Sequence, residues 1–217
     1  MRNYAVPLLM AFLPFAAGCT GQSGQSIPTQ LGQSGTAQAI PNGTNLVVDG
    51  SFESPKVPSG SYTVFGKGTK FGAWTVSGRA SGNVAVVSDK FVYGGYTFPA
   101  ACNHQALDVT GTSNSRNGVE QGVKTVRGAA YTLSFKVGNA YGTGDIGTSS
   151  TVFVLVDGKR VMKATNGMGK GLTHMVWKAF STQVTATSTL TRVSFINGDK
   201  PTDTVNGLDC ISMTANP

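Results

Sequence analysis

The sequence predicts an all-β protein whose strands form an antiparallel β-sandwich. About ten segments combine strand-forming residues with turn residues at their ends, and no segment repeats apolar residues at the spacing of an amphipathic helix. The chain has 217 residues, of which 29 are Gly and 12% are charged. This composition is typical of one turn-rich globular domain with a tail.

The strand signal is clearest in the middle of the chain. Tyr131, Leu133, Phe135 and Val137 alternate with polar residues, which is the period of a strand with one buried face. Asp157-Gly158 is a hairpin turn that joins two neighbouring strands. Many short strands without helices between them favour a sandwich. In order, the expected strands are residues 46–48, 73–77, 83–88, 105–110, 119–126, 131–137, 152–156, 159–161, 176–186, 192–195 and 208–214.

Residues 45–55 open the predicted domain. Leu46-Val47-Val48 is a short apolar run with high strand propensity, and Asp49-Gly50 then turns the chain, since Gly tolerates positive φ. Phe52 is expected in the core, with the Glu53 carboxylate beside it. A carboxylate next to a buried ring needs a partner, because leaving its charge unpaired is costly in desolvation energy.

Residues 1–18 are predicted to be a signal peptide. Arg2 supplies the positive charge, residues 6–15 form the apolar segment, and Ala16-Ala17-Gly18 is a cleavage site of small residues. The apolar segment is too short to span a bilayer. The segment is therefore expected to be removed during export.

Ala16-Ala17-Gly18-Cys19 resembles a bacterial lipoprotein box, with Ala16 at a position where Leu is usual. The resemblance implies that Cys19 is acylated and becomes the mature N-terminus, and more than one acyl chain gives a stable anchor. Thr20, in place of Asp, resembles the enterobacterial sorting signal for the outer membrane. The alternative is an ordinary cleaved signal peptide followed by an unrelated Cys.

Residues 19–44 are expected to form a flexible tether that starts with the lipidated Cys. They consist mainly of Gly, Ser, Gln, Thr and Pro, and they repeat nearly the same phrase at 21–26 and 32–35. Such a segment buries too little apolar surface to order itself. The folded domain is therefore assigned to residues 45–217.

The cysteine count fits an exported chain. There are 3 cysteines, Cys19, Cys102 and Cys210, and acylation of Cys19 would leave one pair. If Cys102 and Cys210 form a disulfide, it closes a loop of roughly a hundred residues and stabilises the fold by up to ~4–5 kcal/mol.

The formal net charge is +7, from 17 Lys and Arg against 10 Asp and Glu. The basic residues are scattered, and the densest group is Lys159, Arg160 and Lys163. The sequence has no basic stripe of the kind that binds nucleic acid. A solvated basic surface is expected, and nucleic acid is not an expected partner.

Familiar catalytic motifs are absent from the sequence. His104 and His174 are far apart, and neither His-Glu-x-x-His nor Gly-x-Ser-x-Gly occurs. Residues 142–147 fit Gly-x-Gly-x-x-Gly, but a predicted strand follows instead of the helix that a nucleotide site needs. Glycoside hydrolysis needs two facing carboxylates, and for Glu53 and Asp209 a structural role is favoured.

An aromatic group surrounds Gly94-Gly95 in a predicted loop between strands, where binding residues usually lie. Exposed rings there would stack on the apolar faces of sugars, and the alternative is a loop packed on its own rings. Two polar residues that follow closely are expected to hydrogen-bond hydroxyl groups. The candidate ligand-binding residues are Phe91, Tyr93, Tyr96, Phe98, Asn103 and His104.

Six phrases follow one another in a fixed order between Asn45 and Thr214. They are residues 45–55, Gly72-Ala73-Trp74-Thr75-Val76, Pro99 through Gln105-Ala106-Leu107-Asp108-Val109, residues 119–135, Trp177 through Leu190, and Gly207-Leu208-Asp209-Cys210-Ile211-Ser212. Together they resemble a family of galactose-binding-like jelly rolls. The family includes plant cell-wall proteins with a domain of unknown function and bacterial exported proteins with interchangeable anchors. The resemblance implies a galactose-binding-like jelly roll.

Two departures from the family pattern are cysteines. Cys210 replaces the second Asp of the closing phrase, and Cys102 lies where Gly is common. Because both cysteines fall at departures, the resemblance is consistent with a disulfide between them.

The resemblance also implies a calcium ion. In many jelly rolls of this type the first and last strands lie side by side and hold calcium where they meet. Glu53 and Asp209 would then come together, with backbone carbonyls of Gly50 or Ser51, and the ion would relieve their repulsion and stabilise the fold. Cys210 removes a third carboxylate. The alternative partners of Glu53 are a Lys or Arg, or backbone N–H groups.

These observations favour a non-catalytic, lipid-anchored module that binds carbohydrate at the bacterial cell envelope. The expected partner is a glycan or polysaccharide, and the membrane is contacted through the acyl anchor alone. The main alternative is a structural or protein-interaction module without a glycan ligand, since plant members of the family are implicated with cell-wall enzymes. A polysaccharide-active enzyme is a third class.

Overall fold

The computed structural model describes residues 43–143, 146–201 and 203–217. The predicted signal peptide, Cys19 and nearly all of the tether lie outside this range. In the described part of the chain the secondary structure consists of strands, and no helix there is long and apolar enough to cross a membrane.

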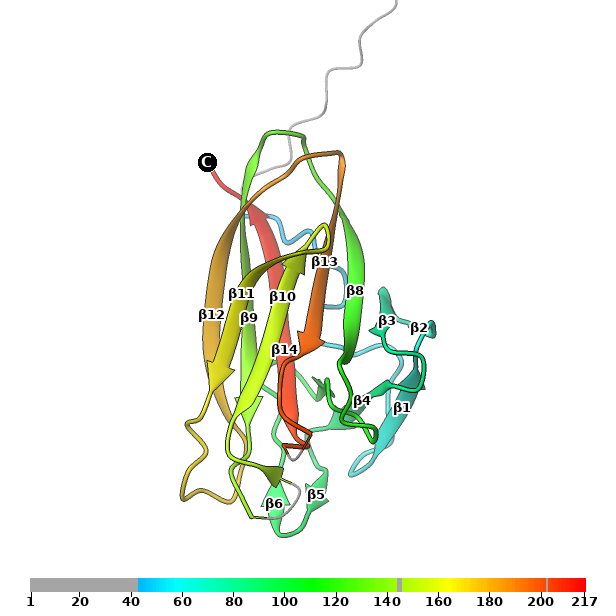
Figure 1. Ribbon diagram of the computed structural model, residues 1–217, viewed down its shortest axis with the longest axis vertical. Helices are drawn as coiled ribbons and strands as arrows, with labels where there is room; N and C mark the ends of the chain where they lie inside the picture. The colour runs from blue at the N-terminus through cyan, green and yellow to red at the C-terminus, as the bar shows by residue number, and fades with distance from the viewer. Residues whose placement is uncertain (1–42, 144–145, 202) are drawn as a thin grey trace, which may run out of the picture. The chain divides into compact units, whose positions relative to one another are not determined.

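Two six-stranded antiparallel sheets make up the fold (Figure 1). The first, the β14 sheet, has the order β1 (Tyr62–Gly66), β4 (Asn83–Ser88), β7 (Gln105–Asp108), β14 (Asn206–Ala215), β9 (Ala130–Asn139) and β12 (Val176–Thr185). The second, the β13 sheet, has the order β11 (Lys159–Asn166), β10 (Ser150–Val156), β13 (Leu190–Asn197), β8 (Asn117–Lys124), β3 (Trp74–Gly78) and β2 (Lys70–Phe71). The predicted all-β antiparallel sandwich is confirmed.

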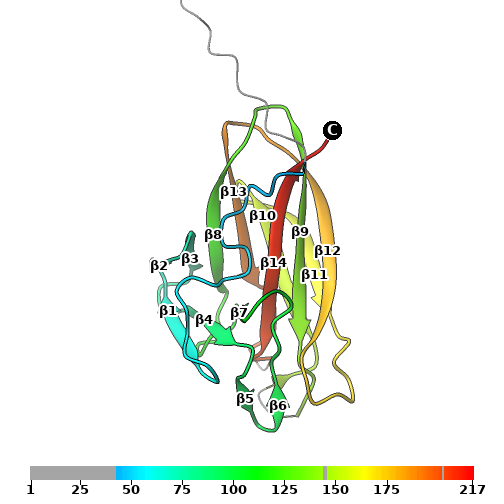
Figure 2. The same cartoon turned by 180° about the vertical axis from the view of Figure 1, so that it is seen from behind.

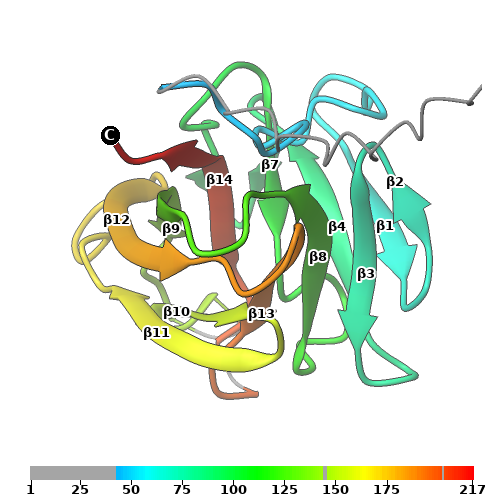
Figure 3. The same cartoon turned by 90° about the horizontal axis from the view of Figure 1, so that it is seen from above.

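Strands that are distant in the sequence are neighbours in both sheets, so the chain crosses repeatedly between the layers. Seen from above, β1 to β4 gather at one side and β9 to β12 at the other (Figure 3). A separate hairpin, β5 (Val92–Tyr93) and β6 (Tyr96–Thr97), stands apart from both sheets.

A run of aromatic rings crosses the core between the sheets. Phe52 and Trp74 are fully buried, with ring centroids 5.3 Å apart. Trp74 also meets Phe195 at 6.2 Å, and Phe195 meets Phe135 at 5.2 Å. Phe52 is thus the core residue that the sequence predicted, and it attaches the opening segment to both layers.

The opening segment runs beside the last strand, as Figure 2 shows from behind. The Leu46 N–H donates to the Met213 carbonyl at 2.9 Å, and the Ile211 N–H donates to the Gly50 carbonyl at 2.8 Å. A Cβ atom at Gly50 would lie 2.0 Å from the Ile211 carbonyl oxygen, so this close approach requires Gly. The positive φ of the turn, 53°, belongs to Asp49 instead.

The strand predicted at 46–48 is wrong. These residues form no strand, and Val48 is 63% exposed. The side-chain amide of Gln121 accepts from the Val48 N–H and donates to the Val48 carbonyl, both at 2.9 Å. A single buried side chain therefore satisfies the backbone groups that a neighbouring strand would otherwise pair.

Candidate functional site

A groove of about 320 Å³ lies on the outer face of the β14 sheet. In β4, Val84 and Val86 point into the core, while Ala85 and Val87 line the groove. This is the ordinary alternation of a strand. Small residues on β7 and β14, Ala106 and Gly207, complete its floor.

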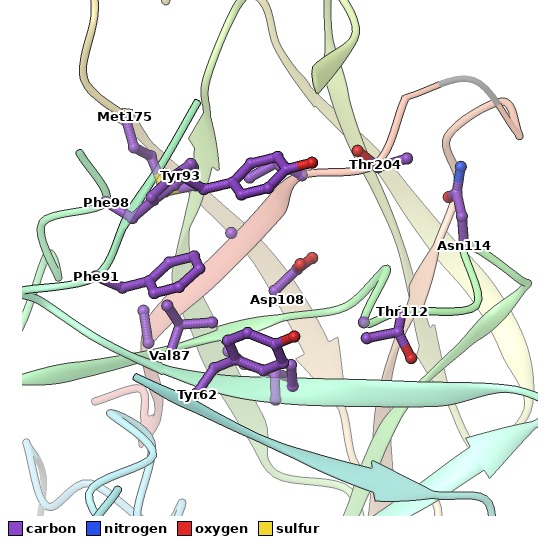
Figure 4. A pocket seen from close by; sticks show the side chains of 16 residues that line it. Tyr62, Val87, Phe91, Tyr93, Phe98, Asp108, Thr112, Asn114, Met175 and Thr204 are labelled. Carbon is purple, nitrogen blue, oxygen red and sulfur yellow. The ribbon is translucent and has the colours of Figure 1, made fainter. Parts of the chain in front are cut away.

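The side chains that line the groove divide into an apolar wall and a polar end (Figure 4). The wall consists of Tyr62, Phe91, Tyr93, Phe98 and Met175. The polar end consists of Asp108, Thr112, Asn114 and Thr204. The other lining residues are Ala85, Val87, Ala106, Leu107, Gly111, Val205 and Gly207.

The wall is built from rings that hold one another in place. Tyr62 meets the edge of Phe91 at a centroid distance of 5.3 Å and an angle of 78°. Phe91 packs on Phe98 at 5.7 Å. Tyr62 is 44% exposed and Tyr93 is 53% exposed, so two tyrosines of the wall remain accessible to a ligand.

The β5–β6 hairpin positions the wall. Gly94 and Gly95 have φ of 57° and 82°, which is the conformation of a two-residue type I′ turn. The Thr97 N–H donates to the Thr173 carbonyl at 3.0 Å, and the Met175 N–H donates to the Thr97 carbonyl at 2.9 Å. The predicted loop is therefore a hairpin pinned to the segment before β12.

Asp108 is the best-fixed group of the polar end. Its Oδ1 accepts from the Thr110 N–H at 2.9 Å, the Thr110 hydroxyl at 2.6 Å and the Asn206 N–H at 3.2 Å. Burial raises the pKa of Asp108 to about 6, although these hydrogen bonds oppose the shift. The Thr112 hydroxyl and the Asn114 amide lie in the loop that follows β7.

Three of the predicted ligand-binding residues, Phe91, Tyr93 and Phe98, line the groove. Tyr96 does not line it: its half-buried ring packs on a second hydrophobic cluster formed by Phe98, Ala140, Ile146 and Met175. The predicted exposure of Tyr96 is thus only partial, because this cluster covers the ring.

Asn103 and His104 are exposed and lie outside the groove. The Asn103 amide donates to the Ser51 hydroxyl at 3.0 Å. The His104 ring lies 3.8 Å from the Asp89 carboxylate. The structure therefore places this polar pair beside the opening segment.

Sequence reasoning missed the remaining groove residues. Tyr62 lies on β1, where its alternation with Val64 is a strand signal that was available. Thr112, Asn114 and Thr204 lie in loops, and their polar character alone does not distinguish them from other loop residues.

Glu53 and Asp209 each hold the backbone of the same loop, residues 101–105. Glu53 Oε1 accepts from the N–H groups of His104 and Gln105, both at 2.9 Å. Asp209 Oδ2 accepts from the N–H groups of Ala101 and Cys102, both at 2.8 Å. The partners of Glu53 are thus backbone N–H groups.

This donor set does not fit calcium, which needs six to eight oxygens. The Gly50 carbonyl accepts from the Ile211 N–H, and the Ser51 hydroxyl accepts from Asn103. In the described residues, the group of acidic, His or Cys side chains close enough to share an ion is Cys102, Asp209 and Cys210, without Glu53. N–H groups, rather than further oxygens, surround both carboxylates.

Cys102 and Cys210 are joined by a disulfide, with an S–S distance of 2.05 Å and a sequence separation of 108. Cys210 has a positive φ of 54°, in a bulge of β14 where the pairing with β9 shifts register. Asp209 precedes it and is fully buried. Burial raises the pKa of Asp209 to about 7, with the charge of Glu53 adding to the effect.

Asp199 is a second buried carboxyl group with a raised pKa. Its Oδ1 accepts from the Thr151 N–H at 2.5 Å, whereas its Oδ2 has no hydrogen-bond partner among the described residues. Burial raises the pKa of Asp199 to about 8, and the neighbouring charge of Asp203 adds to this.

Solved structures are similar to this chain at low sequence identity. A cyclase from Fischerella sp. TAU is 16% identical at a TM-score of 0.54, with 80% of this chain and 98% of the cyclase covered. A CBM22 xylan-binding domain is 17% identical at a TM-score of 0.42, with 66% of this chain and 87% of that domain covered. The CBM22 tandem domain of Paenibacillus barcinonensis Xyn10C is 16% identical at a TM-score of 0.45, with 82% of this chain and 47% of the tandem domain covered. Such similarity concerns the fold alone.

No curated protein matches the chain. The family model described as "Protein of unknown function (DUF642)" matches residues 45–210, the stretch whose six phrases predicted a galactose-binding-like jelly roll. Because the match covers most of the sequence, the chain belongs to the DUF642 family.

Proposed function

We propose that this protein is a carbohydrate-binding module that holds a glycan in the groove of the β14 sheet. The observation that carries the proposal is the pairing of an aromatic wall with a polar end (Figure 4). Tyrosine rings present apolar faces that match the C–H faces of sugars, and a few fixed polar groups give orientation. The groove offers both within one concave site.

The proposed role is binding without catalysis. Glycoside hydrolysis uses two carboxyl groups on opposite sides of the scissile bond. Asp108 is the one acidic side chain among the described residues that line the groove, and its Oδ1 is occupied by three hydrogen bonds. This supports a glycan receptor rather than a hydrolase.

The test is binding of the purified protein to an array of plant and bacterial glycans. Tyr62→Ala and Tyr93→Ala should each weaken binding by about tenfold, since each removes one exposed ring. Val161→Ala is the control, because Val161 is 41% exposed and lies outside the groove. Equal affinity in all variants would refute the groove as the site.

A protein partner is the second candidate function, favoured by Val92 at the hairpin, which is 58% exposed. Large exposed apolar residues beside a groove are also typical of protein docking. An absence of glycan binding, together with capture of a protein that Val92→Asp abolishes, would favour this candidate.

The proposed location is the bacterial cell envelope, with a lipid anchor at Cys19. Support comes from the sequence of residues 1–20, with its signal peptide and lipoprotein-like box. Cys19→Ser should move the protein from the membrane fraction to the soluble fraction and abolish acyl labelling. Unchanged fractionation would exclude the anchor.

A further inference from the structure

The groove differs in charge from the protein as a whole. The chain carries a formal charge of +7, yet none of the described residues that line the groove is Lys, Arg or His. Asp108 is the acidic side chain there. Its pKa is raised to about 6, so it carries a negative charge above that pH. Lys90 adjoins the wall in sequence but pairs with Asp89 at 3.1 Å. The groove therefore contains a negative group without a cation to balance it.

Asp108 cannot move away from a ligand. Three hydrogen bonds, from Thr110 and Asn206, fix its Oδ1, and its position on β7 places it in the floor. Figure 4 shows its carboxylate between the rings of the wall and the polar end. A sugar that spans the groove must pass over this group.

Two effects would weaken the binding of a carboxylated sugar in such a site. Its charge would lose water against apolar walls, and it would meet a fixed like charge at short range, where the local dielectric is low. An uncharged sugar would avoid both the desolvation of a charge and the repulsion, and its hydroxyls would donate hydrogen bonds to the Asp108 carboxylate. The groove should therefore bind uncharged sugars more tightly than carboxylated ones.

We propose that the groove selects uncharged sugar chains and that Asp108 is the residue that excludes carboxylated ones. This inference rests on the proposed function and adds the class of ligand. It also implies that the basic surface of the protein plays no part in recognising the chain in the groove.

The experiment compares matched chains on the purified protein by calorimetry. The probes are cellohexaose and its C6-oxidised form, and β-1,4-mannohexaose and the β-1,4-mannuronate hexamer, with xylohexaose and β-1,4-galactohexaose as further neutral chains. At low salt the neutral member of a pair should bind at least about tenfold more tightly. Sodium chloride at high concentration should leave most of this difference in affinity in place, because charges in short-range contact are screened little, and it should not change the affinity for the neutral chains.

Asp108→Asn is the critical variant, because it keeps the shape of the side chain and removes the charge. It should raise affinity for the carboxylated chain at least about tenfold and change the neutral affinity little. Glu120→Gln is the matched control: it removes one negative charge from β8 of the other sheet, where Glu120 lies 3.9 Å from Arg192. Glu120→Gln should leave the difference in affinity between neutral and carboxylated chains unchanged. If Asp108→Asn does not fold, Asp108→Ser, which also removes the charge, replaces it as the test variant.

The outcomes separate the two proposals. Carboxylated chains that bind as tightly as neutral ones, and that Tyr93→Ala releases, would overturn the selectivity while leaving the groove as the glycan site. If Asp108→Asn still binds neutral chains more tightly than carboxylated ones by the same factor, the role of Asp108 is overturned. Binding of no probe and of no arrayed glycan would remove the proposed function and the inference with it.

Discussion

At the scale of single residues, the buried carboxyl groups of Asp209 and Asp199 differ in how many hydrogen bonds they accept. Asp209 accepts three backbone N–H bonds, from Ala101, Cys102 and Cys210, so its oxygens replace water at a loop and a bulge. Asp199 has one oxygen that accepts a hydrogen bond and one for which the described residues supply no donor. An aspartate with so few donors favours its neutral form, because the buried charge is costly.

The pKa of Asp199 is raised from an ordinary value of 3.8 to about 8, and this makes stability depend on pH. The folded state holds the proton more tightly than the unfolded state. The contribution is therefore complete below about pH 4 and is lost as the pH rises through about 8. The free energy of unfolding should be lower at pH 8 than at pH 5 by at least about 1 kcal/mol.

Urea unfolding across this pH range is the measurement, with Asp199→Asn as the comparison. The amide keeps an oxygen for the Thr151 N–H and has no charge to bury, so the variant should show a flatter profile. Identical profiles for wild type and variant would show that Asp199 does not titrate in this range.

At the scale of elements, the β5–β6 hairpin has two sides with different tasks. Tyr93 and Tyr96 are directly paired across it. Tyr93 is 53% exposed at the groove, whereas Tyr96 packs on the second hydrophobic cluster, with its hydroxyl beside Gly142. One side presents a ring to the ligand and the other holds the hairpin in place.

Tyr96→Ala should lower the free energy of unfolding by about 1–3 kcal/mol, since it removes a packed ring. Tyr93→Ala should cost less than about 0.5 kcal/mol, because the site is exposed. Urea unfolding of both variants measures the difference, and the direct pairing makes each the control for the other. Equal losses would contradict this division.

Sequence periodicity predicted the long strands. It failed for strands of two residues and for a strand without a buried face. β9 and β13 alternate clearly because one face of each is buried. β1 has no buried residue, so the alternation of Tyr62 and Val64 could not be assigned to a buried face. β2, β5 and β6 have two residues each, too few for any period.

The site was predictable only where its residues are neighbours in sequence. Phe91, Tyr93 and Phe98 form a dense aromatic group, so their shared location was evident. Tyr62 and Asn114 reach the groove from a distant strand and a distant loop. Only the pairing of β1 with β4 and of β4 with β7 brings them together, and one sequence does not display that pairing.

At the scale of the whole described fold, the two ends of the chain are fastened to one loop. Glu53 and Asp209 together hold four N–H groups of residues 101–105. The disulfide joins the same loop to β14. The opening segment, the loop and the last strand thus form one closed unit.

Cys102→Ser/Cys210→Ser should lower the free energy of unfolding by about 2–5 kcal/mol, because a long covalent loop restricts the unfolded chain. Excess chelator should leave the wild-type melting temperature unchanged, because the carboxylates are satisfied by N–H groups. Thermal unfolding with reductant or chelator measures both effects. A fall in melting temperature with chelator alone, reversed by calcium, would show that an ion binds here after all.

The bridge between Asn45 and Thr214 places the start of the fold beside its last strand. Figure 1 shows the C-terminal end at the opposite extremity of the sandwich from the β5–β6 hairpin. A support or fusion partner attached at the C-terminal end would therefore lie away from the hairpin, which carries part of the groove wall. The adjacency of Asn45 and Thr214 also suits circular permutation of the described fold, since a short peptide would join Asn45 to the C-terminal end and new ends would open at an exposed turn such as Asp157-Gly158.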